Sequence, residues 1–111
     1  MSDRMEKELP LLYIDTAGTD VSWYSVPSKR TFVLRTLVIT NTASSDAQVT
    51  IKIEFTPEGS TTAETIDKMV IIVPASSTLV LRNLAVELFG SIKVNSNAAG
   101  VYVMGYGEER Y

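Results

Sequence analysis

Few side chains in this sequence are of types that carry out chemistry. Its 111 residues include no histidine and no cysteine. The commonest general base, the Ser-His-Asp arrangement, most zinc and copper sites and all thiolate chemistry are therefore absent. A glycosidase would need two carboxylates across a cleft. The candidates by residue type are Glu54, Glu58, Glu64, Asp67 and Glu87.

Solvated surface charge is the simpler explanation of these carboxylates. Glu54 alternates with apolar residues, which places it on the wet face of a predicted strand, and Glu58 and Glu64 lie in a polar loop. No motif surrounds a serine and a lysine in the way a catalytic dyad requires. We therefore predict that the protein is not an enzyme and has no catalytic residues.

Metal and phosphate sites are equally poorly supported. Calcium needs several Asp or Asn residues at short fixed spacing, whereas Asp15 and Asp20 flank one loop and Asp46 stands alone. Turn formation explains all three. The run 105–107 (GYG) lacks the third glycine and the following helix of a phosphate loop. We predict no metal site and no cofactor.

The aromatic residues allow a binding surface. Trp23 and Tyr24 are adjacent, so on a strand their side chains should point to opposite faces. Tyr102 and Tyr106 should share one face. A platform of Trp and Tyr is how carbohydrate modules stack on sugar rings. We favour core or subunit-interface aromatics instead, because no cluster of Asn, Asp and Gln surrounds them in sequence.

The elements that must position these side chains are β-strands separated by turn clusters. The predicted strands are 11–15, 21–26, 31–41, 47–55, 66–73, 77–82, 91–95 and 101–106. The segment 84–89 is either one helical turn or a further extended piece. About eight strands with no convincing helix indicate an all-β, antiparallel two-sheet sandwich that is jelly-roll-like.

Two strands carry the clearest patterns. Strand 47–55 alternates strictly, which predicts one inward and one wet face. The inward residues are Val49, Ile51, Ile53 and Phe55. Strand 31–41 changes phase between Leu34 and Leu37, which predicts a bulge near Arg35–Thr36. Burial of that strand on both faces is the competing explanation.

Length and composition predict a single domain, residues 11–111, preceded by a charged arm, residues 1–10. We expect the arm to be mobile or to lie on a partner. The apolar run 11–14 is too short for a signal peptide, and no stretch is long enough to span a bilayer. The net charge of −3, with no basic cluster longer than Lys29–Arg30, argues against a nucleic-acid partner.

Apolar residues are numerous for so small a domain. They make up 45% of the chain, and the mean hydropathy is +0.11. Either a subunit contact or an efficient sandwich interior accounts for them. Strands 66–73 and 101–106 are apolar or aromatic on both faces, although a sandwich buries only one. A partner would cover the second face, unless loop 56–65 or segment 84–89 does so. The predicted contact residues are Tyr102, Met104, Tyr106, Trp23 and Tyr24.

The order of turns and strands over residues 20–106 resembles small β-sandwich virion proteins of tailed bacteriophages. A Val-Pro turn with a nearby Lys precedes a long strand that ends in Asn-Thr (26–42), and Val-Thr-Ile-Lys-Ile follows (49–53). Later come Val-Pro before Leu-x-Leu (73–81), Gly-Ser-Ile-Lys-Val (90–94) and Gly-Val-Tyr-Val (100–103). The resemblance implies a component that decorates a capsid, joins head to tail or belongs to the tail, and that acts by assembly.

On this basis we expect a structural virion protein, foremost a small capsid decoration or accessory protein. Its expected partners are further copies of itself, with a trimer as the first expectation, and the major capsid or another virion protein. It would be made in the host cytoplasm without a signal peptide and would bind neither nucleic acid nor membrane. The alternative is a carbohydrate-binding or adhesion module.

Overall fold

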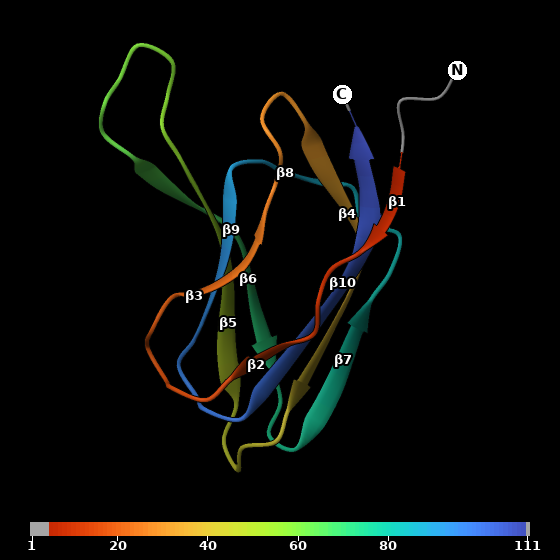
Figure 1. Ribbon diagram of the computed structural model, residues 1–111. Helices are drawn as coiled ribbons and strands as arrows, with labels where there is room; N and C mark the ends of the chain where they lie inside the picture. The colour runs from red at the N-terminus through yellow and green to blue at the C-terminus, as the bar shows by residue number, and fades with distance from the viewer. Residues whose placement is uncertain (1–4, 111) are drawn as a thin grey trace.

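A computed structural model describes residues 5–110, which form ten β-strands in two antiparallel sheets (Figure 1). The strands are β1 Met5–Glu8, β2 Leu12–Ile14, β3 Val21–Ser25, β4 Thr31–Asn41, β5 Ala47–Phe55, β6 Glu64–Val73, β7 Ser77–Leu81, β8 Val86–Leu88, β9 Ser91–Ser96 and β10 Val101–Arg110. The described residues contain no helix. The predicted all-β class is confirmed.

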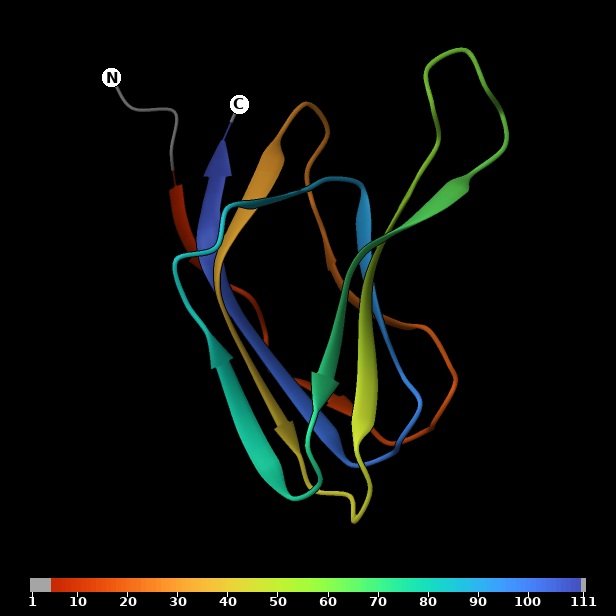
Figure 2. The same cartoon turned by 180° about the vertical axis from the view of Figure 1, so that it is seen from behind.

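Sheet A has the order β1-β10-β4-β7, with β2 also on β10 and β8 also on β4; sheet B has the order β3-β9-β5-β6. Strands β1 and β2 follow one another along the same edge of β10. Strands β7 and β8 likewise follow one another along the free edge of β4. Figure 2, seen from behind, shows β7 beside β4. Sheet A therefore has four strand positions, and the sandwich has eight.

The pairing of these eight positions is nested. The first position (β1 and β2) pairs with the last (β10), β3 with β9, β4 with β7 and β8, and β5 with β6. A chain paired in this way is a long hairpin rolled into two sheets, which is the jelly-roll arrangement. The predicted jelly-roll-like sandwich with about eight strands is confirmed.

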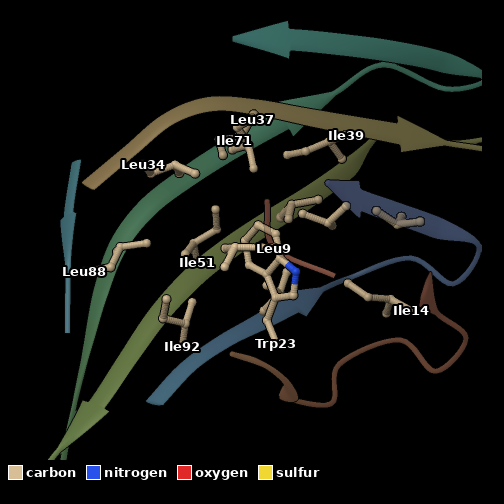
Figure 3. Close-up of a cluster of buried hydrophobic side chains, with 14 of the residues drawn as sticks. Leu9, Ile14, Trp23, Leu34, Leu37, Ile39, Ile51, Ile71, Leu88 and Ile92 are labelled. Carbon is tan, nitrogen blue, oxygen red and sulfur yellow. The ribbon is translucent and has the colours of Figure 1, made fainter. Parts of the chain in front are cut away.

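The interior lies between the inner faces of the two sheets (Figure 3). Val49, Ile51 and Ile53 are fully buried, as the alternation of strand 47–55 predicts. Phe55 is only half-buried at the end of β5, where its ring packs edge-on against Phe89 with 5.0 Å between centroids.

The predicted bulge in strand 31–41 is present. Tyr106 of β10 pairs with Thr36 and the next residue, Gly107, pairs with Leu34, so Arg35 is the extra residue. The bulge turns both Leu34 and Leu37 into the interior, where each is fully buried. A phase shift in the sequence thus marks a local irregularity of the ladder, and burial on both faces of this strand is limited to its start, where Val33 is buried as well as Phe32 and Leu34.

Two glycines of β10 let other chain segments approach it closely. A Cβ atom on Gly105 would lie 2.7 Å from Cη2 of Trp23, and one on Gly107 would lie 2.1 Å from the carbonyl oxygen of Val33. Contacts this short exclude any side chain at either position. The glycines of the GYG run therefore serve packing in the interior.

The strand boundaries agree with the prediction to within one residue except at the start of β6 and the end of β10, and segment 84–89 takes one of its two predicted forms. Segment 84–89 is extended and contains β8, β6 begins two residues earlier than expected, and β10 continues to Arg110. Residues 5–8 of the predicted arm form β1, which pairs with β10 of the chain's own sheet. The physical reason is that the C-terminal half of β10 offers an unpaired edge beside it. Residues 1–4 lie outside the described residues.

The buried face of β5 gives a direct stability test. Replacing Ile51, which is fully buried, with Asp would place a carboxylate without a partner in the apolar interior. We expect Ile51→Asp to lower the free energy of unfolding by more than about 3 kcal/mol in urea denaturation. Thr50→Asp, one residue away on the outer face, is the matched control and should cost far less. Equal melting of Ile51→Asp and the parent would contradict the assigned inner face.

Candidate interaction surface

The outer face of sheet B carries ion pairs on β5 and β9, and the exposed side chains of Val70 and Ile72 lie beside them on β6. Lys52 Nζ lies 3.2 Å from Asp20 Oδ1, and Lys93 Nζ lies 3.1 Å from Glu54 Oε2. The side-chain amide of Asn95 donates to Asp20 over 2.7 Å. That hydrogen bond, with Lys52 beside it, lowers the pKa of Asp20. A surface of paired charges is well solvated and has little to gain from a partner.

The outer face of sheet A is apolar and aromatic by contrast. We call it the tyrosine face and define it by Tyr13, Val38, Val80, Tyr102, Met104 and Tyr106. The strand register sets Val80, Val38 and Met104 side by side across three strands. The neighbouring row runs Thr78, Thr40, Tyr102 and Tyr13. Neither of these two central rows holds a charged side chain.

Side chains of the tyrosine face reach solvent in the isolated chain. Tyr102 is 38% exposed, Met104 42% and Tyr106 43%. The 56–63 loop belongs to sheet B, and β8 lies in the plane of sheet A beside β4, so neither segment covers these residues. The predicted outward placement of these three side chains is confirmed, and the contact they would make stays a prediction.

The tyrosine face is nearly flat and has only a shallow depression. A depression of about 100 Å³ lies beside Met104 and Tyr106 and is bounded by Glu8 at the sheet edge. Tyr106 donates its hydroxyl hydrogen to Glu6 Oε2 over 3.0 Å, which raises the pKa of Tyr106. The rings of Tyr13 and Tyr102 lie 4.6 Å apart between centroids, tilted by 37°. A nearly flat apolar centre with an acidic edge suits another flat surface better than a small enclosed ligand.

Trp23 and Tyr24 are not part of this surface, which corrects the prediction for both. Trp23 is 5% exposed, lies among the buried side chains of Figure 3, and donates its indole N–H to the carbonyl oxygen of Pro10 over 2.7 Å. Strand β3 bulges at Trp23, because Ser22 pairs with Lys93 and Tyr24 with the next residue of β9, Ile92. The extra residue turns two consecutive aromatic side chains inward, so they do not alternate.

A buried carboxylate organises the end of the sandwich near Tyr24. Glu109 is 3% exposed and accepts hydrogen bonds from the Tyr24 hydroxyl and, over 3.1 Å, from Arg30 Nη1. Lys7 Nζ lies 3.7 Å from Glu109 and 4.8 Å from the Tyr24 ring centroid. The Tyr24 hydrogen bond, followed by the two cations, lowers the pKa of Glu109 although burial opposes it. This cluster ties β1, β3 and the β3–β4 turn to β10.

Sequence reasoning missed Glu109. The one available signal was spacing: positions 101, 103, 105, 107 and 109 continue the inward alternation of β10 beyond its predicted end at residue 106. A glutamate at an inward position near a strand end requires cations, and Lys7 and Arg30 supply them from distant parts of the chain.

The other candidate residues lie apart. Glu54 is paired with Lys93, Glu58 lies in the 56–63 loop, and Glu87 lies on β8 in the opposite sheet. Asp46 accepts a hydrogen bond from the backbone N–H of Ala75 over 3.1 Å, and Asp15 accepts one from the hydroxyl of Thr16. Within residues 5–110, no three His, Cys, Asp or Glu side chains gather closely enough to hold a metal ion. The described segment also has no helix long and apolar enough to cross a membrane.

Comparison with known proteins gives a fold relationship only. No family model matches the chain, and no curated protein does. A solved structure of Bacillus endospore appendages, described as forming a family of disulfide-linked pili, is similar with a TM-score of 0.50 and 14% identity. The match covers 99% of this chain and 89% of that one. At this identity the likeness shows the shared β-sandwich fold alone.

The Glu109 cluster generates a pH-dependent prediction. Because its pKa is lower in the folded than in the unfolded chain, Glu109 stabilises the fold above the ordinary value of 4.5, and that stabilisation is lost as the pH falls through the lowered pKa. At pH 7, Glu109→Gln should reduce the free energy of unfolding by roughly 2–4 kcal/mol.

The measurement is urea denaturation of the parent and Glu109→Gln between pH 3 and 7. Parent and variant should converge as the pH drops. Glu58→Gln, in an exposed loop, is the control and should follow the parent throughout. A constant difference between parent and Glu109→Gln across this range would rule out ionisation of Glu109 as the source of the stabilisation.

Proposed function

We propose that the protein is a structural subunit that works by assembly, and that its tyrosine face binds the tyrosine face of a second copy. The observation that carries this proposal is the contrast between the two outer faces. Sheet B carries ion pairs on the outer face of β5 and β9, with Val70 and Ile72 exposed only at its β6 edge, whereas sheet A exposes Tyr102 and Met104 in two uncharged rows that cross the sheet and Tyr106 beside them. Tyr and Met are enriched at the centres of protein interfaces, and charged residues are depleted there.

The size and chemistry of the face fit a second copy. The outer face of sheet A measures about 34 Å along the ten residues of β10 and about 19 Å across four strand positions, or roughly 650 Å², and the tyrosine face, between residues 102 and 106 of β10, makes up about half of it. Two copies packed along the whole outer face of sheet A would bury about 1,300 Å², within the range of about 1,200–2,000 Å² for stable interfaces, and the two tyrosine faces would supply about half of that area. A twofold contact sets a surface against itself. The uncharged central rows bring no like charges together, whereas sheet B would oppose its own lysines and carboxylates.

The setting we propose for this assembly is the virion of a tailed bacteriophage, with the protein as a capsid decoration or accessory protein. This part rests on the resemblance of residues 20–106 to such proteins. The appendage protein of similar fold is described as forming pili, which supports assembly as a use of this architecture. Disulfide linkage is not open to these 111 residues, which contain no cysteine.

Face-to-face packing makes a dimer the basic unit of the proposed assembly. The trimer suggested by the resemblance would require the tyrosine face to meet a different surface of the next copy. The exposed side chains of Val70 and Ile72 on β6 are one such surface. The mass in solution distinguishes these arrangements.

The test is light scattering coupled to size-exclusion chromatography. We expect the parent to elute as a dimer or a multiple of it, and Tyr102→Ser with Met104→Lys to give a folded species of smaller mass, because a lysine would be buried at the contact. Gln48→Ser with Thr50→Lys, beside Val70 and Ile72 on the outer face of sheet B, should keep the parent mass, and a smaller mass for this variant would show a contact through Val70 and Ile72 instead. A parent that is monomeric at micromolar concentration would refute the proposal.

A carbohydrate-binding or adhesion module is the second candidate, because three tyrosines are exposed together on one face. A glycan array separates it from the first. Glycan binding by a monomeric parent, lost in Tyr102→Ser with Met104→Lys, would favour the second candidate over assembly.

A further inference from the structure

The β3–β4 turn and the 56–63 loop lie at the same end of the molecule (Figure 1). Between them is an open hollow of about 350 Å³, lined by β3, β5, β9 and these loops and by no residue of sheet A. Its volume falls within the range of about 300–1,000 Å³ typical of small-ligand sites. The hollow is separate from the tyrosine face, so an inference about it does not rest on the proposed assembly.

Four residues that carry hydroxyl groups line this hollow, each from a separate segment. Ser25 comes from the end of β3, Ser28 from the following turn, Thr56 from the start of the 56–63 loop and Ser91 from the start of β9. Among residues 5–110, none of these four hydroxyls hydrogen-bonds to another protein group. Each is free to donate one hydrogen bond and accept others.

Gly90 keeps the floor of the hollow open. Its φ is +69°, and a Cβ there would lie 2.4 Å from the carbonyl oxygen of Glu54. The Gly90 carbonyl oxygen accepts a hydrogen bond from the N–H of Val26 over 2.9 Å. The backbone of three segments is therefore drawn together beneath the hydroxyls, with no side chain at position 90 to fill the space.

The remaining lining defines the chemistry of a ligand. Phe55 and Ala63 are the apolar lining residues, and Glu54 is the acidic one, with its carboxylate Oε2 held by Lys93. No lysine, arginine or histidine lines the hollow, which disfavours a phosphate or another anion. A single carboxylate is too few hard ligands for a metal ion. Hydroxyls, one carboxylate and an aromatic edge together suit a neutral molecule that is rich in hydroxyl groups and has an apolar face.

We propose that this hollow is a saccharide-binding site. The hydroxyls of Ser25, Ser28, Thr56 and Ser91 exchange hydrogen bonds with the hydroxyls of one sugar unit, and Glu54 accepts from another. The apolar side of the sugar ring lies against Phe55. The 56–63 loop forms the outer wall through Ala63.

The test is a titration followed by ¹H–¹⁵N NMR, with glucose, galactose, mannose and N-acetylglucosamine as separate probes and glycerol as the non-sugar control. We expect at least one sugar to give saturable shifts at the amides of Ser25, Ser28 and Ser91, and glycerol to give none. Ser25→Ala with Ser91→Ala should weaken binding roughly tenfold or more, because two hydrogen-bonding groups are lost. Ser22→Ala, on the same strand but outside the hollow, should bind like the parent.

A blocking variant tests the location of the site independently. Ala63→Trp should fill the hollow and abolish the shifts, and Thr61→Trp in the same loop should not. Absence of saturable shifts with all four sugars overturns the proposal, as does binding that survives Ala63→Trp. Shifts confined to Tyr13, Tyr102 and Tyr106 would also overturn it and would place the sugar on the tyrosine face. The mass in solution should be unchanged by Ala63→Trp, so failure here and failure of the proposed assembly are distinguishable.

Discussion

Burial in a two-layer sandwich is limited to one face of each sheet, and this constraint governs how the chain distributes its apolar residues. Strand β10 shows the consequence most clearly. Its inward positions hold two valines, two glycines and the paired Glu109, all buried. Its outward positions hold Tyr102, Met104 and Tyr106, which the interior cannot reach. Among residues 5–110, half of the large apolar side chains that stay exposed therefore lie on the tyrosine face, and that face is what the proposed assembly uses.

Close approach of the two layers depends on β10 carrying glycine where large rings arrive from other strands. The Trp23 ring lies over Gly105, and Phe32 lies near Gly107. The bulge of β3 at Trp23 points the tryptophan side chain into the interior. The bulge of β4 at Arg35 turns Leu34 inward opposite Gly107. Two residues beyond Gly107, Glu109 also faces the interior, and the positive charges of Lys7 and Arg30 compensate its buried carboxylate. One strand thus sets both the packing of the centre and the electrostatics of the end.

The sequence was most informative where a signal depends on neighbours along the chain. The alternation that buries Ile51 and the phase shift that marks Arg35 are local, and both predictions are confirmed. The inward turn of Tyr24 was not predictable, because the β3 bulge exists only in its pairing with β9. The pairing of Met5 with Glu109 joins residues from opposite ends of the chain, and nothing local specifies it. The hydroxyls around the hollow likewise become a group only when four segments meet.

The central claim is that the tyrosine face is covered in solution by another copy, and hydroxyl-radical footprinting read out by mass spectrometry tests it most directly. Met104 is 42% exposed in the single chain and reacts readily with such radicals. Met69, half-buried on β6 of the other sheet, serves as the internal reference. We predict that oxidation of Met104 relative to Met69 falls as the protein concentration rises through the range in which the mass increases. A ratio that stays constant while the protein assembles would show that the copies meet through a different surface.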